Sequence, residues 1–205
     1  MKKFIILANG KSPKKKEILP FIKDGYTLVC ADGGANSAYK LEIVPSYIIG
    51  DFDSIKPKVK RFYKNFSQFI KIKDQTKTDV EKSLDFIIKK GAKEVLLFGL
   101  GGNRFDHILY NLLSLCKYSS KVDIAVINKK QIINFVTKSV EFESSKEEII
   151  SLFDLQGTLH VNSKGLKYKL DGRNIKSISN ETTSNSVKLE LSGRGCLVII
   201  RELKV

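Results

Sequence analysis

The chain has 205 residues, which is enough for one large domain or two small ones. Its hydrophobic fraction of 42% and charged fraction of 28% exclude a disordered chain and indicate a globular protein with a buried core. A formal net charge of +14 would suit nucleic acid, an anionic membrane or a polyanionic substrate. The lysines are scattered, however, and only Lys11–Lys16 is dense, so we interpret the charge as a solvated surface and expect no nucleic-acid partner.

The cysteines and the apolar runs indicate the compartment. Cys30, Cys116 and Cys196 are far apart and flanked by apolar residues, as expected for buried thiols in a reducing compartment. The apolar run Phe4–Ala8 is too short for a signal peptide, and no later run approaches the ~20 apolar residues of a membrane helix. We therefore expect a cytoplasmic protein that does not associate with membranes.

Residues 1–120 alternate short apolar runs with segments of helical periodicity. This alternation predicts an α/β domain with a parallel sheet and helices on both faces. A helix is expected to begin at a capping box, Thr78–Glu81, and to stop at Gly91. A second helix, at about 106–117, is apolar nearly all round and is expected to be buried. The expected strands are Phe4–Ala8, Thr27–Ala31, Tyr47–Gly50, Phe69–Ile72 and Val95–Phe98.

Residues 121–205 have a different pattern, in which short β segments are separated by turn residues. This spacing predicts an all-β sandwich or barrel, with Lys117–Lys121 as the boundary segment between the two domains. The expected strands are Asp123–Ile127, Ile132–Val136, Ile149–Phe153, Thr158–Val161, Leu166–Leu170, Val187–Leu191 and Cys196–Arg201.

Four polar segments follow strands of the first half, where a parallel sheet places its ligands. Ala31–Asn36 contains two glycines before a helix, which allows close approach of an anion or simply makes a turn. In Gly50–Ser54, Asp51 and Asp53 project to one side and repel unless a cation lies between them. That spacing suits Mg²⁺, although an Asx turn is the plainer alternative.

The other two segments complete the predicted site. Asp74–Asp79 places Asp79 in the first turn of a helix, where it either joins the carboxylates or only offsets the helix dipole. Gly99–His107 combines glycines with Arg104, which suits a polyphosphate. We interpret His107 as an ordinary helix-start histidine. The P-loop and dinucleotide fingerprints are both absent from the sequence.

Taken together, the four segments resemble the bacterial-type thiamin pyrophosphokinase family. The match comprises ADGGAN at 31–36, GDFDS at 50–54, DQTKTD at 74–79 and GGNRFDH at 101–107. In the β half, Gly165–Leu170 and Ser177–Glu181 resemble the thiamin-side motifs of that family, with Tyr168 where the family often has Trp. The resemblance therefore spans nearly the whole chain.

The resemblance implies a thiamine diphosphokinase, which transfers the pyrophosphoryl group of ATP to the hydroxyl of thiamine and releases AMP. It implies that residues 1–120 bind ATP and Mg²⁺, that residues 121–205 bind thiamine, and that the protein is a homodimer. Asp51, Asp53 and Asp79 would be catalytic and bind the metal, Arg104 would offset charge on the transferred group, and Tyr168, Ser179 and Asn180 would bind thiamine. The implied ATP-binding residues are Asn9, Gly10, Asp32, Gly33, Gly34, Asn36, Gln75, Thr78, Gly101, Gly102, Arg104 and Asp106.

Two other functions stay open at the level of sequence. The DxD spacing also suits a metal-dependent glycosyl- or nucleotidyltransferase acting on a sugar nucleotide. The basic charge suits an RNA-binding protein, which would show steeply salt-dependent binding to arbitrary RNA.

Overall fold

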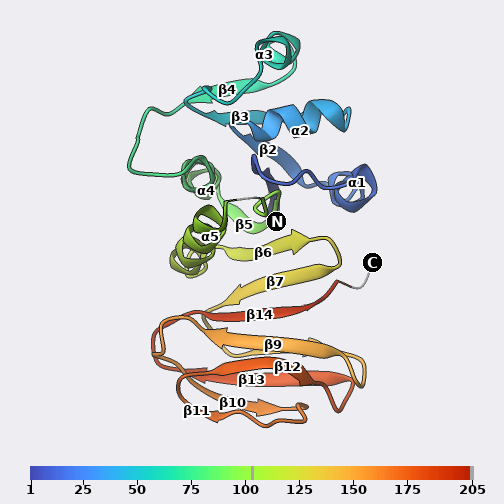
Figure 1. Cartoon of the computed structure of the whole chain (residues 1–205), viewed down its shortest axis with the longest axis vertical. Helices are drawn as coiled ribbons and strands as arrows, with labels where there is room; N and C mark the ends of the chain where they lie inside the picture. The colour runs from blue at the N-terminus through green and yellow to red at the C-terminus, as the bar shows by residue number, and fades with distance from the viewer. Residues whose placement is uncertain (103, 204–205) are drawn as a thin grey trace. The chain divides into compact units, whose positions relative to one another are not determined.

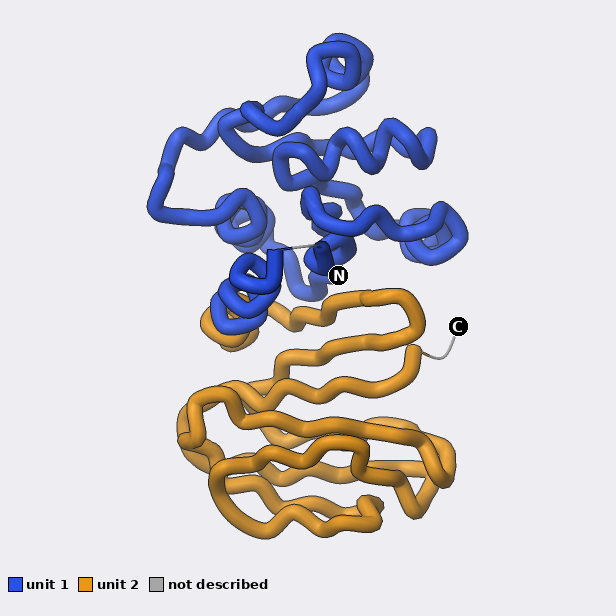
Figure 2. Tube along the Cα trace, in the orientation of Figure 1, with its two compact units in different colours: residues 1–114 blue, residues 115–205 orange. Residues whose placement is uncertain are grey.

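The computed structural model describes residues 1–102 and 104–203, so Asn103 of the GGNRFDH motif lies outside the described residues. The chain divides into two compact units, Met1–Ser114 and Leu115–Val205 (Figure 2). Within the described residues, no helix is long and apolar enough to cross a membrane.

Unit 1 is built on five parallel strands in the order β5-β1-β2-β3-β4 (Figure 1). The strands are β1 (Lys2–Leu7), β2 (Thr27–Ala31), β3 (Tyr47–Gly50), β4 (Gln68–Lys71) and β5 (Ala92–Phe98). The helices are α1 (Lys15–Lys23), α2 (Gly34–Lys40), α3 (Pro57–Tyr63), α4 (Asp79–Lys89) and α5 (Phe105–Tyr118), whose last residues belong to unit 2. The α/β prediction is confirmed.

The strand order places a switch point beside β1. Successive crossovers carry the chain in one direction from β1 to β4, and the chain then returns to β5 on the other side of β1. Because such crossovers are right-handed, α1, α2 and α3 lie on one face of the sheet and α4 on the other. Sheets of this kind bind ligands at such a switch point, which here lies at the carboxyl ends of β1 and β5.

The two ends of α4 follow the local sequence signals. The hydroxyl of Thr78 accepts a hydrogen bond from the backbone N–H of Glu81 at 3.3 Å, and the Glu81 carboxylate accepts one from the N–H of Thr78 at 2.9 Å. Gly91, with φ +83, follows the last turn and stops the helix. The capping box and the glycine stop are both confirmed.

The expectation that α5 is buried all round is wrong along one stripe. Phe105, Leu109 and Leu113 follow one another at intervals of four residues and are 75%, 47% and 44% exposed. The opposite side of the helix carries Ser114 and Leu115, which are buried. Apolar composition alone does not distinguish a helix surrounded by its own chain from one with an apolar stripe on the surface.

Unit 2 is a β-sandwich of two antiparallel sheets, as predicted. One sheet contains β6 (Asp123–Asn128), β7 (Gln131–Val136), β14 (Leu197–Glu202), β9 (Ile149–Asp154) and β12 (Lys176–Glu181) in that spatial order. The other contains β8 (Val140–Glu143), β13 (Ser186–Ser192), β10 (His160–Lys164) and β11 (Asp171–Gly172). Buried Leu152 and Leu197 of the first sheet share one core with Val161 and Leu189 of the second.

The expected strand Leu166–Leu170 is wrong. Leu166 makes only an isolated bridge to Thr182, and the segment continues as a loop. Its alternating apolar residues imitate a strand, but Leu166 is buried whereas Tyr168 is 64% exposed. Asp171 and Gly172, which follow that loop, form the short strand β11.

Candidate functional site

Three carboxylates from three separate loops converge at the carboxyl edge of the unit 1 sheet. Asp32, Asp51 and Asp79 each offer one oxygen, and these oxygens lie within 4.8 Å of one another. Asp32 follows β2, Asp51 follows β3 and Asp79 opens α4. Of the three predicted metal ligands, the structure thus brings Asp51 and Asp79 together, and Asp32, predicted as an ATP-binding residue, joins them.

The backbone makes room for this cluster at Gly50. A Cβ at this position would lie 2.8 Å from the Cβ of Asp32 and 3.2 Å from Oδ1 of Asp79, so any larger residue would push the carboxylates apart. Asp32 itself has φ +41, a left-handed conformation that is uncommon outside glycine. Local strain is therefore concentrated where the acids meet.

Burial, together with nearby Asp53 and Asp79, raises the pKa of Asp32 to about 6, against the hydrogen bond from the N–H of Ser54, which lowers it. Its Oδ1 is buried without a hydrogen-bond partner among the described residues. The pKa of Asp51 is lowered, first by the N–H of Asp53. Asp53 lies beside Asp32 and accepts a hydrogen bond from the Ser54 hydroxyl at 2.8 Å. An unpartnered carboxylate oxygen within an acidic cluster fits a hard cation such as Mg²⁺.

A buried lysine, which the sequence analysis did not single out, contacts this cluster. The ammonium of Lys82 lies 2.8 Å from Oδ1 of Asp79, and the lysine side chain is only 4% exposed. Fully ionised, the three carboxylates carry three negative charges against the single positive charge of Lys82. The excess negative charge, to which neighbouring Asp53 adds, favours a divalent cation.

Glycine-rich loops form a pocket of about 430 Å³ next to the acids. The loop after β1 lies directly on the loop after β5, since Gly10 donates a hydrogen bond to the carbonyl of Gly99 at 2.8 Å. A Cβ on Gly10 would lie 2.2 Å from that same oxygen, so only glycine fits. The pocket is lined by Asn9, Gly10, Ser54, Thr78, Asp79, Gly101, Gly102, Arg104, His107 and Asn111, among others.

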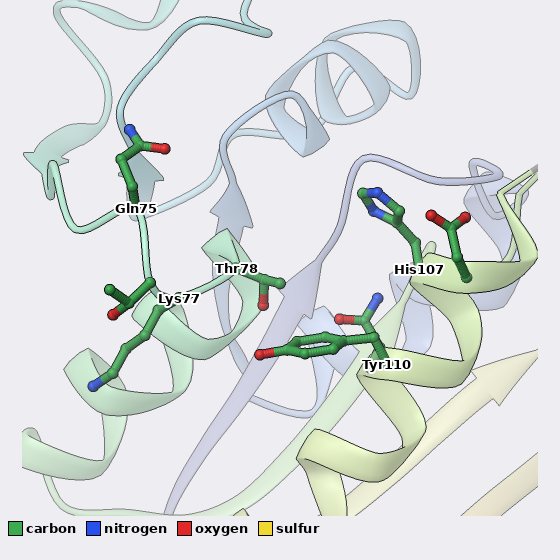
Figure 3. Close-up of a pocket in the computed structure, with 8 residues that line it drawn as sticks. Gln75, Lys77, Thr78, His107 and Tyr110 are labelled. Atoms are coloured by element: carbon green, nitrogen blue, oxygen red, sulfur yellow. The ribbon is translucent and has the colours of Figure 1, made fainter.

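A second pocket of about 400 Å³ lies between the start of α4 and α5 (Figure 3). His107 and Tyr110 project from α5, facing Thr78 at the start of α4 (Figure 3). Gln75 and Lys77 extend its wall along the loop before α4. Thr78, His107 and Asn111 line both pockets, so the two hollows adjoin. The predicted ATP-binding residues Gln75, Thr78 and Asp106 therefore gather here.

Buried Glu81 joins the two walls of this second pocket. It accepts a hydrogen bond from the Ser114 hydroxyl at 2.5 Å and one from the Tyr110 hydroxyl at 3.4 Å, both on α5. The same side chain caps α4 through Thr78. One carboxylate thus links the two helices, and these hydrogen bonds lower its pKa although burial raises it.

The predicted phosphate-binding arginine pairs with its own neighbour. Arg104 donates to both carboxylate oxygens of Asp106, at 2.9 Å and 2.6 Å, and the pair is well exposed. This bidentate contact lowers the pKa of Asp106 to about 2. Arg104 also lines the glycine-rich pocket, so its guanidinium stands at the pocket rim.

The predicted ATP-binding residues Gly33, Gly34 and Asn36 lie at the start of α2, close to neighbouring loops. The Asn36 amide donates to the carbonyl of Ser54 at 2.9 Å and accepts from the N–H of Lys56 at 3.0 Å. Gly33 and Gly34 start α2 so close to the end of β1 that a Cβ on either would overlap Asn9 or Leu7. These three residues hold the loops that carry Asp32 and Asp51.

The three predicted thiamine-binding residues lie in unit 2. Tyr168 is 64% exposed on the loop after β10, and Ser179 is exposed on a bulge of β12 with φ +52. Asn180 is fully buried, and its amide bonds the backbone of Tyr168.

Clustered carboxylates beside a glycine-lined pocket are typical of a phosphotransferase. Comparison with known proteins narrows this class. Residues 20–127 match the family model "Thiamin pyrophosphokinase, catalytic domain".

Relatives and solved structures agree with the family model. Thiamine pyrophosphokinase 1 of Oryza sativa subsp. japonica is 28% identical over 216 residues, covering 91% of this chain and 80% of the relative. Thiamine pyrophosphokinase of Bacillus subtilis is 26% identical, covering 98% of this chain and 99% of the relative. The fold matches thiamin pyrophosphokinase from Candida albicans with a TM-score of 0.86 at 22% identity, covering 99% of this chain and 89% of the other. The chain belongs to the thiamin pyrophosphokinase family, whose enzymes make thiamine diphosphate from thiamine and ATP.

The Lys82–Asp79 pair should show a coupling energy of about 1–3 kcal/mol in a double-mutant cycle with Lys82→Met and Asp79→Asn. Each single change leaves the partner charge without its counter-ion, whereas the double variant removes both charges. Urea unfolding in EDTA measures the four free energies. As the control, the more exposed pair Lys77–Asp85 should couple by under about 1 kcal/mol. Equal coupling in both cycles would show that Lys82 is not a buried counter-ion.

Proposed function

We propose that the chain transfers the pyrophosphoryl group of ATP to the hydroxyl of thiamine, using Mg²⁺ held by the acidic cluster, and that it acts as a homodimer. The observation that carries this proposal is the convergence of Asp32, Asp51 and Asp79 beside the glycine-rich pocket. Membership of the family supplies the substrates.

Asp51, Asp53 and Asp79, together with Asp32, would hold Mg²⁺, which when bound neutralises charge on the polyphosphate. The backbone N–H groups of Gly101 and Gly102, with Asn9 and Gly10 opposite, would hold the phosphates in the pocket. Gln75 and Thr78 would line the adjoining part of the nucleotide site.

The thiamine hydroxyl oxygen would form a bond to the β-phosphorus of ATP while the bond from that phosphorus to the bridging oxygen of AMP breaks. One carboxylate of the cluster would take the hydroxyl proton. Arg104 would turn from Asp106 to the transferred group and offset its charge. Tyr168 would stack on a thiamine ring, and Ser179 would hydrogen-bond to it.

The decisive assay mixes the protein with ATP, Mg²⁺ and thiamine and measures AMP and thiamine diphosphate in equal amounts. Asp32→Asn, Asp51→Asn, Asp53→Asn and Asp79→Asn should each abolish turnover while keeping the far-UV circular dichroism, because each removes a charge but little volume. Asp74→Asn, on an exposed loop residue that contacts Thr76, is the matched control and should stay active. ADP in place of AMP, or binding of a UDP-sugar in preference to thiamine by calorimetry, would refute the proposal.

We expect Arg104 to affect kcat through the two parallel hydrogen bonds that its guanidinium can donate. Arg104→Ala should lower kcat by about 100-fold, as loss of a single transition-state donor typically does. Arg104→Lys should recover only part of the rate, since lysine cannot form two parallel hydrogen bonds. Steady-state kinetics with Arg61→Ala, an arginine on α3, as the control measures this effect. A wild-type rate for Arg104→Ala would make the Arg104–Asp106 pair purely structural.

The homodimer is supported by the exposed stripe of Phe105, Leu109 and Leu113 on α5. A regular row of large apolar side chains at the surface is typical of an interface with another copy. Leu113→Glu should therefore convert dimers to monomers in sedimentation equilibrium. Val44→Glu, at a residue 53% exposed outside α5, should leave the dimer intact. A wild-type protein that sediments as a monomer at all concentrations would contradict this prediction.

A further inference from the structure

The loop that carries Tyr168 has little regular structure to hold it. Gly165–Leu170 follows β10 and is not a strand, yet it presents a tyrosine that is 64% exposed. Its ends are fastened, because Thr183 donates to the carbonyl of Gly165 at 2.9 Å and Ser163 donates to that of Leu170 at 3.0 Å. An exposed aromatic ring at the middle of such a loop needs a local support if its direction is to be fixed.

Asn180 supplies that support. Its Oδ1 accepts from the N–H of Tyr168 at 3.1 Å, and its Nδ2 donates to the carbonyl of Tyr168 at 2.8 Å. The backbone N–H of Lys167 donates to the carbonyl of Glu181 at 2.8 Å. A side-chain amide has the same donor and acceptor as a peptide group, so the two bonds of Asn180 extend this pairing to Tyr168. Tyr168 is therefore held by its backbone, which fixes the direction in which its exposed side chain leaves the loop.

The amide of Asn180 has no bonding capacity left for a ligand. Oδ1 also accepts from the N–H of Glu181 at 2.8 Å, and Nδ2 also donates to the Ser177 hydroxyl at 3.0 Å. Two donors and two acceptor positions are all satisfied, and the residue is 0% exposed. A direct hydrogen bond from Asn180 to a substrate would require breaking one of these four bonds.

The bulge in β12 explains how Asn180 reaches this position. The register with β9 shifts between Ser177 and Asn180, which leaves Ile178 and Ser179 outside the ladder and exposed. The N–H of Ser179 is held by the hydroxyl of Ser151 at 3.0 Å. The bulge thus turns Asn180 inward against the backbone of Tyr168 and leaves Ser179 exposed.

We propose that Asn180 is a positioning residue, which fixes the direction of the Tyr168 ring for stacking and does not itself contact thiamine. The inference rests on the proposed function of Tyr168. Of these two neighbouring residues, Ser179 would contact the ligand, whereas Asn180 would support the loop that carries Tyr168.

Hydrogen exchange tests the clamp, by which we mean the two hydrogen bonds between the Asn180 amide and the Tyr168 backbone, without any substrate. The amide of Tyr168 should exchange slowly in the wild type and at least about tenfold faster in Asn180→Ala, because a hydrogen-bonded amide exchanges only through opening. Asn180→Ser, which replaces the amide with a smaller polar hydroxyl at the buried position, serves if the alanine variant does not fold. Equal exchange rates in the wild type and in a folded variant would overturn the clamp.

Kinetics then test the positioning role. Asn180→Ala should raise KM for thiamine about three- to tenfold, the size of a lost aromatic contact, with KM for ATP unchanged. In a Tyr168→Ala background the same change should have no further effect. Lys167→Met removes an exposed ion pair next to Tyr168 and should leave both KM values alone.

The kinetic results distinguish a failure of the Asn180 inference from a failure of the proposed thiamine contact. If Tyr168→Ala raises KM for thiamine but Asn180→Ala adds its own full effect on top, Asn180 contacts the ligand and the inference fails while the proposed function stands. An equal rise of KM for both substrates in Asn180→Ala would make the residue merely structural. If Tyr168→Ala leaves KM for thiamine unchanged, the proposed thiamine contact itself fails, and the inference with it.

Discussion

Mutual repulsion among Asp32, Asp51 and Asp79 is the constraint on which unit 1 depends. Three loops bring one oxygen of each carboxylate within 4.8 Å of the others, and burial together with the neighbouring acids raises the pKa of Asp32 to about 6. Like charges at this separation destabilise the fold unless cations compensate them. Lys82 supplies one positive charge from inside the protein. The buried strands of the parallel sheet hold the three acidic loops together, because the carboxyl ends of parallel strands meet at one edge.

The positions of the loops at this edge are fixed by close contacts between backbones. Gly10 and Gly50 sit where any Cβ would collide with the neighbouring loop or with an acid. Glu81 then fixes α4, whose first residue is Asp79, against α5. A displacement of α5 would therefore reach the carboxylate cluster through a single buried side chain. Loops held in this way keep a site preorganised without regular structure of their own.

The sequence predicts the loops of the site better than the partners within it. The motifs at 31–36, 50–54 and 74–79 place the aspartates after strands, and topology does the rest. Periodicity cannot show that Asp32 turns into the cluster, because this depends on a left-handed φ. Nor can it find Lys82, since a lysine one turn after Asp79 looks like an ordinary surface residue until its 4% exposure is known. The exposed stripe of α5 is unpredictable for the opposite reason, because large apolar residues are normally buried.

In unit 2 the prediction fails where the chain departs from regular pairing, and that is where the exposed polar and aromatic side chains gather. Alternation suggested a strand at Leu166–Leu170, which would have placed Tyr168 on the same face as Leu166. The loop instead separates them, with Leu166 in the core and Tyr168 outside. A regular strand could not present Ser179 and bury Asn180 while also exposing Ile178, because its side chains alternate strictly. The bulge breaks that alternation, and the buried amide of Asn180 then forms hydrogen bonds to the backbone of Tyr168. Irregularity here is therefore a structural requirement of the surface that unit 2 presents.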